Sequence, residues 1–193
     1  MSQEEIIAEK KKAIFEGTLE LVRENGFHGT PMSLVAKKAG VAAGTIYHYF
    51  ESKDALIIAL HGYLRSQMFK VMVESDDEQQ DYKSRFFAFW KKHYQFYVQN
   101  PNALYFIEQF VNSPYYERCP EKENDRCQNI ISNFVKTGID DGTLKQMNLK
   151  LMSILVHSSV VTTAKIYLTK KVDIGDAELH QVAQLVWDGI KNH

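Results

Sequence analysis

Apolar residues recur every three or four positions along almost all of the 193-residue chain, which is the spacing of one face of an α-helix. The first such stretch runs from about Gln3 to Asn25, and Gly26 follows it as a typical residue after a helix end. No pair of segments alternates in the two-residue pattern of paired strands, and no internal repeat is found. The pattern predicts an all-α protein.

Turn and capping residues divide the amino-terminal part into short helices. Thr30 and Pro31 are typical of an N-cap followed by proline at the first helical position, and they predict a short helix that ends at Gly40. Ser52 is predicted to cap a further helix, with Asp54 in its first turn. The acidic run that follows, residues 74–81, interrupts the apolar pattern. We expect this run to be a surface loop near the boundary between two domains, to which we assign residues 1–60 and residues 61–193.

The carboxy-terminal part is predicted to consist of helices alone. They are expected at Tyr82–Gln99, Ala103–Asn112, roughly Lys122–Ile139, Leu149–Leu168 and Asp176–Lys191. Leu149–Leu168 is apolar around its whole circumference, but it carries charged and polar side chains, so a membrane span is not expected. A soluble helix of this kind must be covered on every side.

The last two helices together hold more apolar surface than one small domain covers. We therefore expect a homodimer in which two helices from each chain form a bundle. The residues expected at this dimer interface are Leu155, Val160, Thr163, Val182, Leu185 and Val186.

The segment from Ser33 to Ser52, SLVAKKAGVAAGTIYHYFES, has the pattern of a helix-turn-helix. Ala36 falls where two helices would cross closely, and Gly40 falls in the turn, where a positive φ is easiest without a Cβ atom. The apolar positions needed between the two helices are Val35, Ala39, Val41, Ile46 and Tyr49. Every position of the motif is filled by a suitable residue type.

This segment resembles the TetR family of transcriptional repressors over about residues 10–60. The matching residues are Thr30, Ala36, Ala39, Gly40, Val41, Gly44, Thr45, Ile46, Tyr47, His48, Tyr49, Phe50, Lys53 and Leu56. The resemblance implies an amino-terminal three-helix DNA-binding domain and a carboxy-terminal helical domain for ligand binding and dimerisation. It also implies a homodimer on a near-palindromic, double-stranded operator.

The same resemblance indicates which residues contact DNA: Thr30, Ala43, Gly44, Thr45, Tyr47, His48 and Lys53. Tyr47 and His48 are adjacent and cannot both face one core, which favours an exposed role. Lys53 is expected to contact a phosphate. Positions 42 and 43 are both alanine, where the family often has a hydroxyl residue and then a long polar one. The expected recognition helix therefore lacks a side-chain cap.

The helix Tyr82–Gln99 is rich in aromatic rings, which line either a core or a ligand pocket. We expect a pocket for a small, largely apolar or aromatic effector, lined by Phe87, Trp90, Tyr94, Tyr97, Tyr105, Phe106, Gln109, Phe110 and His157. Core packing remains the alternative for the individual rings.

Composition adds little and excludes some chemistry. The net charge is -1, and residues 1–60 contain seven lysines and arginines against eight acidic residues, so any DNA contact depends on placement. Two cysteines with no zinc-type spacing predict reduced thiols and a cytoplasmic location, without a metal or cofactor. No catalytic residues are predicted. An all-helical enzyme, or a DNA-binding regulator without an effector, remain the alternatives.

Overall fold

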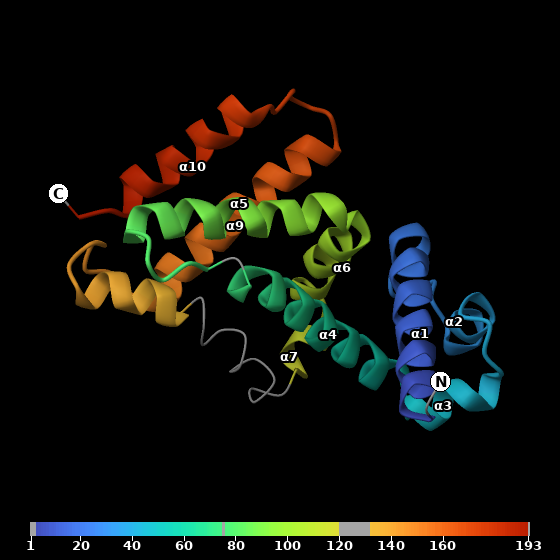
Figure 1. The fold of residues 1–193 in the computed structure, drawn as a ribbon. Coiled ribbons are helices and arrows are strands. Elements are labelled where there is room, and N and C mark those ends of the chain that lie inside the picture. The colour runs from blue at the N-terminus through green and yellow to red at the C-terminus, as the bar shows by residue number, and fades with distance from the viewer. Residues whose placement is uncertain (1–2, 75, 120–131, 193) are drawn as a thin grey trace. The chain divides into compact units, whose positions relative to one another are not determined.

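The computed structural model describes residues 3–74, 76–119 and 132–192, and all its regular elements there are helices (Figure 1). They are α1 (Gln3–Asn25), α2 (Met32–Lys38), α3 (Ala43–Tyr49), α4 (Lys53–Val73), α5 (Tyr82–Gln99), α6 (Pro101–Val111), α7 (Pro114–Glu117), an unlabelled helix at 132–140, α9 (Leu149–Leu168) and α10 (Asp176–Ile190). The described residues contain no strand beyond one isolated antiparallel bridge between Leu144 and Lys191. The all-α prediction is confirmed.

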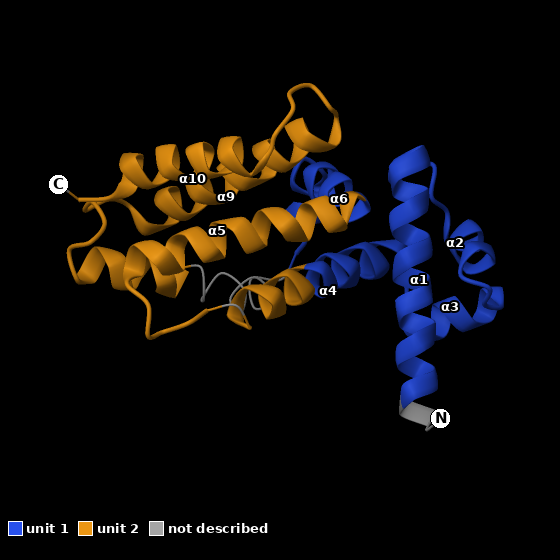
Figure 2. Ribbon diagram, turned by 45° about the horizontal axis from the view of Figure 1, so that its top comes forward, with its two compact units in different colours: residues 1–64, 102–119 blue, residues 65–101, 120–193 orange. Residues whose placement is uncertain are grey.

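The helices form two compact units (Figure 2). Unit 1 contains residues 1–64 and 102–119, and unit 2 contains residues 65–101 and 120–193. This division differs from the predicted domains, because α6 and α7 belong to unit 1. Most of the predicted helix Lys122–Ile139 lies outside the described residues.

In unit 1, the helix-turn-helix packs against α1. Val35, Ala36 and Ile46 are almost completely buried, as the motif requires. A Cβ atom on Gly17 would lie 3.1 Å from Cγ of Lys38, so the small residue allows α1 and α2 to approach closely. Gly40 has a φ of 66°, which confirms the turn predicted there.

The helix α6 is held to α1 by apolar and polar contacts within unit 1. The rings of Phe27 and Phe106 meet edge to face at 5.5 Å, and Phe106 is fully buried. The amide of Gln109 donates to the carbonyl of Val22 at 3.3 Å. These contacts explain why α6 belongs to the same unit as the helix-turn-helix.

In unit 2, α5 packs against both α9 and α10 (Figure 2). The ring of Phe86 lies 5.4 Å from the indole of Trp187, which joins α5 to α10. The hydroxyl of Tyr82 donates to the carbonyl of Phe134 at 2.8 Å and so fastens α5 to helix 132–140. The core of this unit is therefore largely aromatic.

Two capping predictions have different outcomes. The hydroxyl of Ser52 accepts a hydrogen bond from the backbone N–H of Ala55, so Ser52 caps α4 as predicted. Thr30 is not the N-cap of α2, because that helix begins at Met32 with Pro31 as its N-cap. The carbonyl of Pro31 accepts the first helical bonds, from the N–H groups of Leu34 and Val35. The pyrrolidine ring fits this position as well, since an N-cap needs no N–H group.

We expect Gly138→Ala to destabilise the protein by about 1–2 kcal/mol. The new Cβ atom would lie 2.5 Å from the hydroxyl of Tyr82, and moving that ring would break its bond to Phe134. Gly189→Ala is the matched control, because nothing lies within 4 Å of its Cβ position. Urea unfolding of both variants measures the difference, and equal stability would contradict the close contact.

Candidate DNA-binding surface and ligand site

The outer face of α3 is formed by small residues followed by two aromatic ones. Ile46 is fully buried and fixes the inner face of the helix, while Tyr47 is 56% exposed. Ala43, Gly44 and His48 are also exposed, and Thr45 is half-buried. Nothing lies within 4 Å of a Cβ atom placed on Gly44. The predicted recognition residues therefore lie on one open surface of unit 1.

The amino-terminal end of α3 has no side-chain cap. Ala42 is its N-cap residue and makes no side-chain hydrogen bond, in agreement with the sequence. The backbone N–H groups of the first turn are consequently not covered by a capping side chain. The structure thus combines an end without a side-chain cap with a start of the helix that carries almost no side-chain bulk.

Thr30 and Lys53, which were also expected to contact DNA, are used inside unit 1. Thr30 is 1% exposed, and its hydroxyl donates to the carbonyl of Gly26 at 2.8 Å. The ammonium group of Lys53 donates to the carbonyl of Phe27, and burial lowers the pKa of this lysine. Both side chains bind carbonyls just after the end of α1. We therefore leave Thr30 out of the DNA surface and assign Lys53 a structural role before a phosphate contact.

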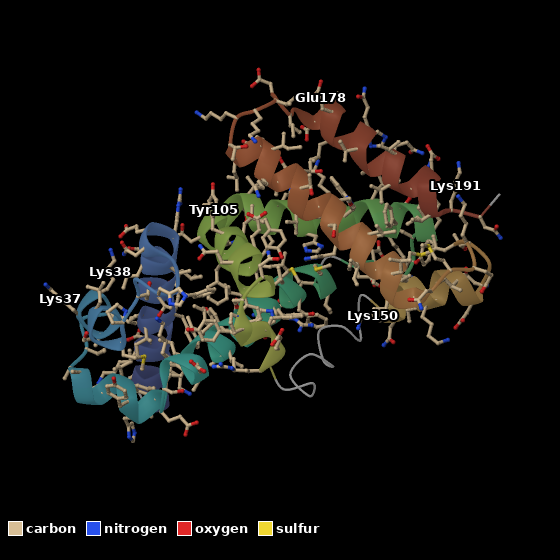
Figure 3. All side chains as sticks on the ribbon, turned by 180° about the vertical axis from the view of Figure 1, so that it is seen from behind. Lys37, Lys38, Tyr105, Lys150, Glu178 and Lys191 are labelled. Atoms are coloured by element: carbon tan, nitrogen blue, oxygen red, sulfur yellow. The ribbon has the colours of Figure 1, made fainter. Side chains whose placement is uncertain are left out.

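Basic side chains near the motif are partly neutralised by their neighbours. Lys38 forms an ion pair with Glu20 at 2.6 Å, and this carboxylate raises the pKa of the lysine. Lys37 is exposed next to it at the end of α2 (Figure 3). Its exposure, which no sequence pattern singled out, makes Lys37 a candidate for a phosphate contact.

The residues predicted to line the effector pocket fall into both units. Phe87, Trp90, Tyr94, Tyr97 and His157 belong to unit 2, and Tyr105, Phe106, Gln109 and Phe110 belong to unit 1. In unit 1 these side chains have partners of their own. Phe110 stacks on His61 at 4.0 Å, and the guanidinium of Arg23 lies 5.1 Å from the ring of Tyr105. The four α6 residues therefore have a packing role in unit 1.

The pocket residues of unit 2 lie along the contact between α5 and α9. Trp90 is fully buried, and its indole N–H donates to the hydroxyl of Ser159 at 2.9 Å. The rings of Tyr94 and Tyr167 meet edge to face at 6.1 Å. Phe87 is half-buried and packs on His180 of α10 at 5.1 Å. Indole and phenol groups thus place polar atoms within an otherwise apolar contact.

The most unusual part of this contact is a pair of buried histidines. His93 of α5 is 1% exposed, and its ring centre lies 5.0 Å from that of His157 on α9 and 5.4 Å from that of Tyr97. Among the described residues, neither ring nitrogen of His93 has a hydrogen-bond partner. No local pattern in the sequence indicates His93, because His157 lies 64 positions further along the chain.

Burial keeps this pair uncharged. Burial holds the pKa of His93 well below its usual value, and repulsion from a positive charge on His157 would lower it further. Burial also lowers the pKa of His157 to about 4, and the positive charge of Arg65 acts in the same direction. Burial raises the pKa of Tyr97, so its phenol remains protonated. At neutral pH the cluster therefore offers neutral hydrogen-bonding groups beside one guanidinium.

Apolar side chains on α9 and α10 remain uncovered in the single chain. Leu155 is 52% exposed and Leu185 is 74% exposed, whereas Val182 and Val186 are half-buried. Val160 and Thr163 are buried inside unit 2 and so cannot reach a partner chain. We withdraw both from the expected interface. The exposed stripe on α9 is instead completed by Leu151 and Ile154.

By length and hydropathy alone, α9 is also the one described helix that would be able to span a membrane. Its inner face carries the hydroxyl of Thr163, which donates to the carbonyl of Ser159 at 2.7 Å, and packs on α5. The core helix of a water-exposed unit has the same composition. No group of three or more histidines, cysteines or acidic residues suited to a metal occurs in the described parts of the chain.

A helix-turn-helix unit joined to a second all-helical unit defines the class of DNA-binding transcriptional regulators. Residues 14–60 match the family model of bacterial regulatory proteins of the tetR family, and residues 81–191 match the tetracyclin repressor-like carboxy-terminal domain. The chain belongs to the TetR family. The resemblance inferred from the sequence motif is confirmed.

Several known proteins are similar over nearly the whole chain. The fatty acid metabolism regulator protein of Bacillus subtilis is 27% identical over 189 residues, which cover 95% of this chain and 96% of that protein. A TetR-family regulator from a Shewanella species has a TM-score of 0.86 at 24% identity, covering 95% and 99% of the two chains. The B. subtilis regulator FadR, solved with stearoyl-CoA, has a TM-score of 0.78 at 23% identity, covering 93% and 98%. These structural likenesses concern the fold.

Because the pKa values of both buried histidines are lowered, we expect the free energy of unfolding to decrease as the pH falls. An unfolded histidine has a pKa near 6.5, so the unfolded chain takes up protons before the folded one as the pH falls. The contribution of neutral His157 to the free energy of unfolding is fully present above pH 6.5. It is lost as the pH falls from there towards the folded pKa of about 4. We expect this loss to reach roughly 3 kcal/mol at most.

Urea unfolding at pH 7.5 and pH 5.0 tests this expectation. His157→Gln should lose less stability between the two pH values than the wild type does. His180→Gln, which changes an exposed histidine on α10, should behave as the wild type. An identical pH dependence in all three proteins would show that His157 is not held neutral by the fold.

Proposed function

We propose that the chain is a cytoplasmic, homodimeric repressor that binds a near-palindromic operator through α3. The observation that carries this proposal is the open face of α3, where Ala43, Gly44, Tyr47 and His48 lie exposed above the buried Ile46. Small residues allow the helix start to approach the major groove closely. The ring hydroxyl and imidazole can then reach phosphates or base edges.

Two exposed apolar helices support the dimer. Two copies of α9 and α10 would bury Leu155 and Leu185 in a four-helix bundle, which removes an apolar patch that a monomer would leave in water. A dimer also presents two recognition helices, which a near-palindromic operator requires.

We further propose that a ligand with a long acyl chain releases the operator. The apolar contact between α5 and α9 in unit 2 suits such a chain, with Trp90, Tyr94 and Tyr97 among its rings. The support from similarity is that the B. subtilis relative is a fatty acid metabolism regulator and that FadR was solved with stearoyl-CoA. The ligand would act by favouring the conformation that binds DNA less well.

Operator selection from a random DNA pool, followed by release assays, tests this function. The selected DNA should be released by long-chain acyl compounds and not by aromatic or cationic compounds of similar size. The same acyl compounds should raise the melting temperature according to their concentration over their Kd. DNA binding without release by any compound would leave a regulator that lacks an effector, which is the alternative considered from the sequence.

Tyr47→Ala should weaken operator binding by about 1–3 kcal/mol, because its exposed ring is expected to contact DNA. Tyr116→Ala is the control, since Tyr116 is also an exposed tyrosine of unit 1 but lies on α7. Affinities at several salt concentrations give the comparison. The salt dependence should be shallow for a dimeric repressor, because the motif has few unpaired basic side chains. Equal affinities of the two variants would remove Tyr47 from the DNA contact.

Leu155→Glu combined with Leu185→Glu should convert the dimer into a folded monomer, because four charged side chains would meet in the bundle. Val111→Glu changes an exposed apolar residue in unit 1 and should leave the dimer intact. Sedimentation at micromolar concentration, with circular dichroism as the check on folding, measures the outcome. A wild-type monomer under these conditions would rule out the proposed dimer.

A further inference from the structure

The buried ring of His93 requires a hydrogen-bond partner that the described residues do not supply. Both of its nitrogens are buried and unpaired at the contact between α5 and α9. Leaving a buried polar group unpaired costs about 1–3 kcal/mol, and a phenylalanine or leucine would fill the same space without this cost. A histidine at this position is therefore explained best by a group that binds it.

The surroundings of the ring decide what kind of group this is. The ring of His93 meets the rings of Phe89, Tyr97 and His157, and the positive charge of Arg65 contributes to the lowered pKa of His157. A cation is disfavoured next to His157, because the positive charge of Arg65, which already lowers the pKa of this histidine, would repel it. A neutral imidazole offers one N–H donor and one acceptor nitrogen, and an oxygen atom that accepts a hydrogen bond satisfies the donor.

The same surroundings restrict the rest of the ligand. The side chains of Phe89 and Tyr97 lie 6.3 Å and 5.4 Å from the ring of His93, measured between ring centres. Trp90 lies about one turn before His93 on α5 and Phe86 about two turns before it. Both are almost completely buried. The oxygen must therefore belong to a molecule that is otherwise largely apolar.

We propose that His93 donates a hydrogen bond to the carbonyl oxygen at the head of an acyl effector, with His157 beside it at the same end of the ligand. This inference rests on the acyl effector put forward under Proposed function and assigns the position of its head group. A thioester and a free fatty acid share the carbonyl oxygen, so both are candidate sources.

The arrangement also explains why the histidines are neutral. A protonated pair beside Arg65 would place three positive charges in an apolar contact, which burial opposes. A neutral His93 can bind a thioester carbonyl without any change of charge. A carboxylate would instead draw a proton onto the pair, since a nearby negative charge favours the imidazolium form.

The experiment compares two probes that differ only in the carbonyl. Palmitoyl-CoA contains the thioester oxygen, whereas S-hexadecyl-CoA has a thioether and lacks it. Calorimetry on the full-length dimer gives the Kd of each probe, and the ratio of the two values isolates the carbonyl contact. We expect the wild type to prefer palmitoyl-CoA about tenfold, as a buried neutral hydrogen bond would give.

Three variants locate this preference. His93→Leu should lose it, so that both probes bind with nearly equal Kd, and the ligand-free variant should melt no lower than the wild type. His93→Gln keeps a donor and should retain part of the preference. His180→Leu, which changes a histidine exposed on α10 in the same unit, should keep all of the preference.

Palmitate, measured in two buffers of different ionisation enthalpy, should bind with proton uptake if the free acid is the source.

The outcomes separate the two proposals. If palmitoyl-CoA binds and releases the operator but the ratio is the same in wild type and His93→Leu, the acyl effector stands and the assignment of its head group is overturned. If neither probe nor palmitate binds the wild type, the acyl effector itself is overturned, and this inference with it.

Discussion

The packing of α5 on α9 determines how every other face of unit 2 is used. On α9, which packs on α5 and α10, Met152, Val156 and Val160 are buried, whereas Leu151, Ile154 and Leu155 remain exposed among the described residues. These exposed side chains are the apolar surface that the proposed dimer would cover. The contact between α5 and α9 encloses the polar groups of His93 and Trp90, of which only the indole has a partner within the described residues. The proposed dimer surface and the proposed ligand site therefore both involve α9.

Much of the fold was predictable because it depends on local pattern. Gly40, Ser52 and the run of small and aromatic residues in α3 act through their immediate neighbours, so the sequence contains the necessary information. The N-cap of α2 was placed one residue early, since Pro31 can occupy either the cap or the first turn. The membership of α6 in unit 1 was not predictable, because it depends on Phe27 and Val22, about 80 positions away.

The candidate sites show the same division. The exposure of Tyr47 follows from the helical position of Ile46, and the sequence predicted it. The internal bonds of Thr30 and Lys53 depend on carbonyls at the end of α1, which no motif reveals. His93 was overlooked for a related reason. Whether a histidine on a ring-rich helix has a hydrogen-bond partner depends on the neighbouring helix that packs on it. A helical pattern does not show which side chains of that neighbour face the histidine.

The helix α4 contributes residues to both units, since the boundary between them falls at Leu64 and Arg65. In its first turn, the ammonium group of Lys53 donates a hydrogen bond to the carbonyl of Phe27. Arg65 lies about three turns after Lys53 in the same helix. If either unit unfolds, half of α4 loses the side chains that stabilise it, and the remaining half becomes an exposed helix end that frays. The chain therefore gains cooperativity in unfolding from one shared element, so that damage to the core of one unit lowers the stability of the other.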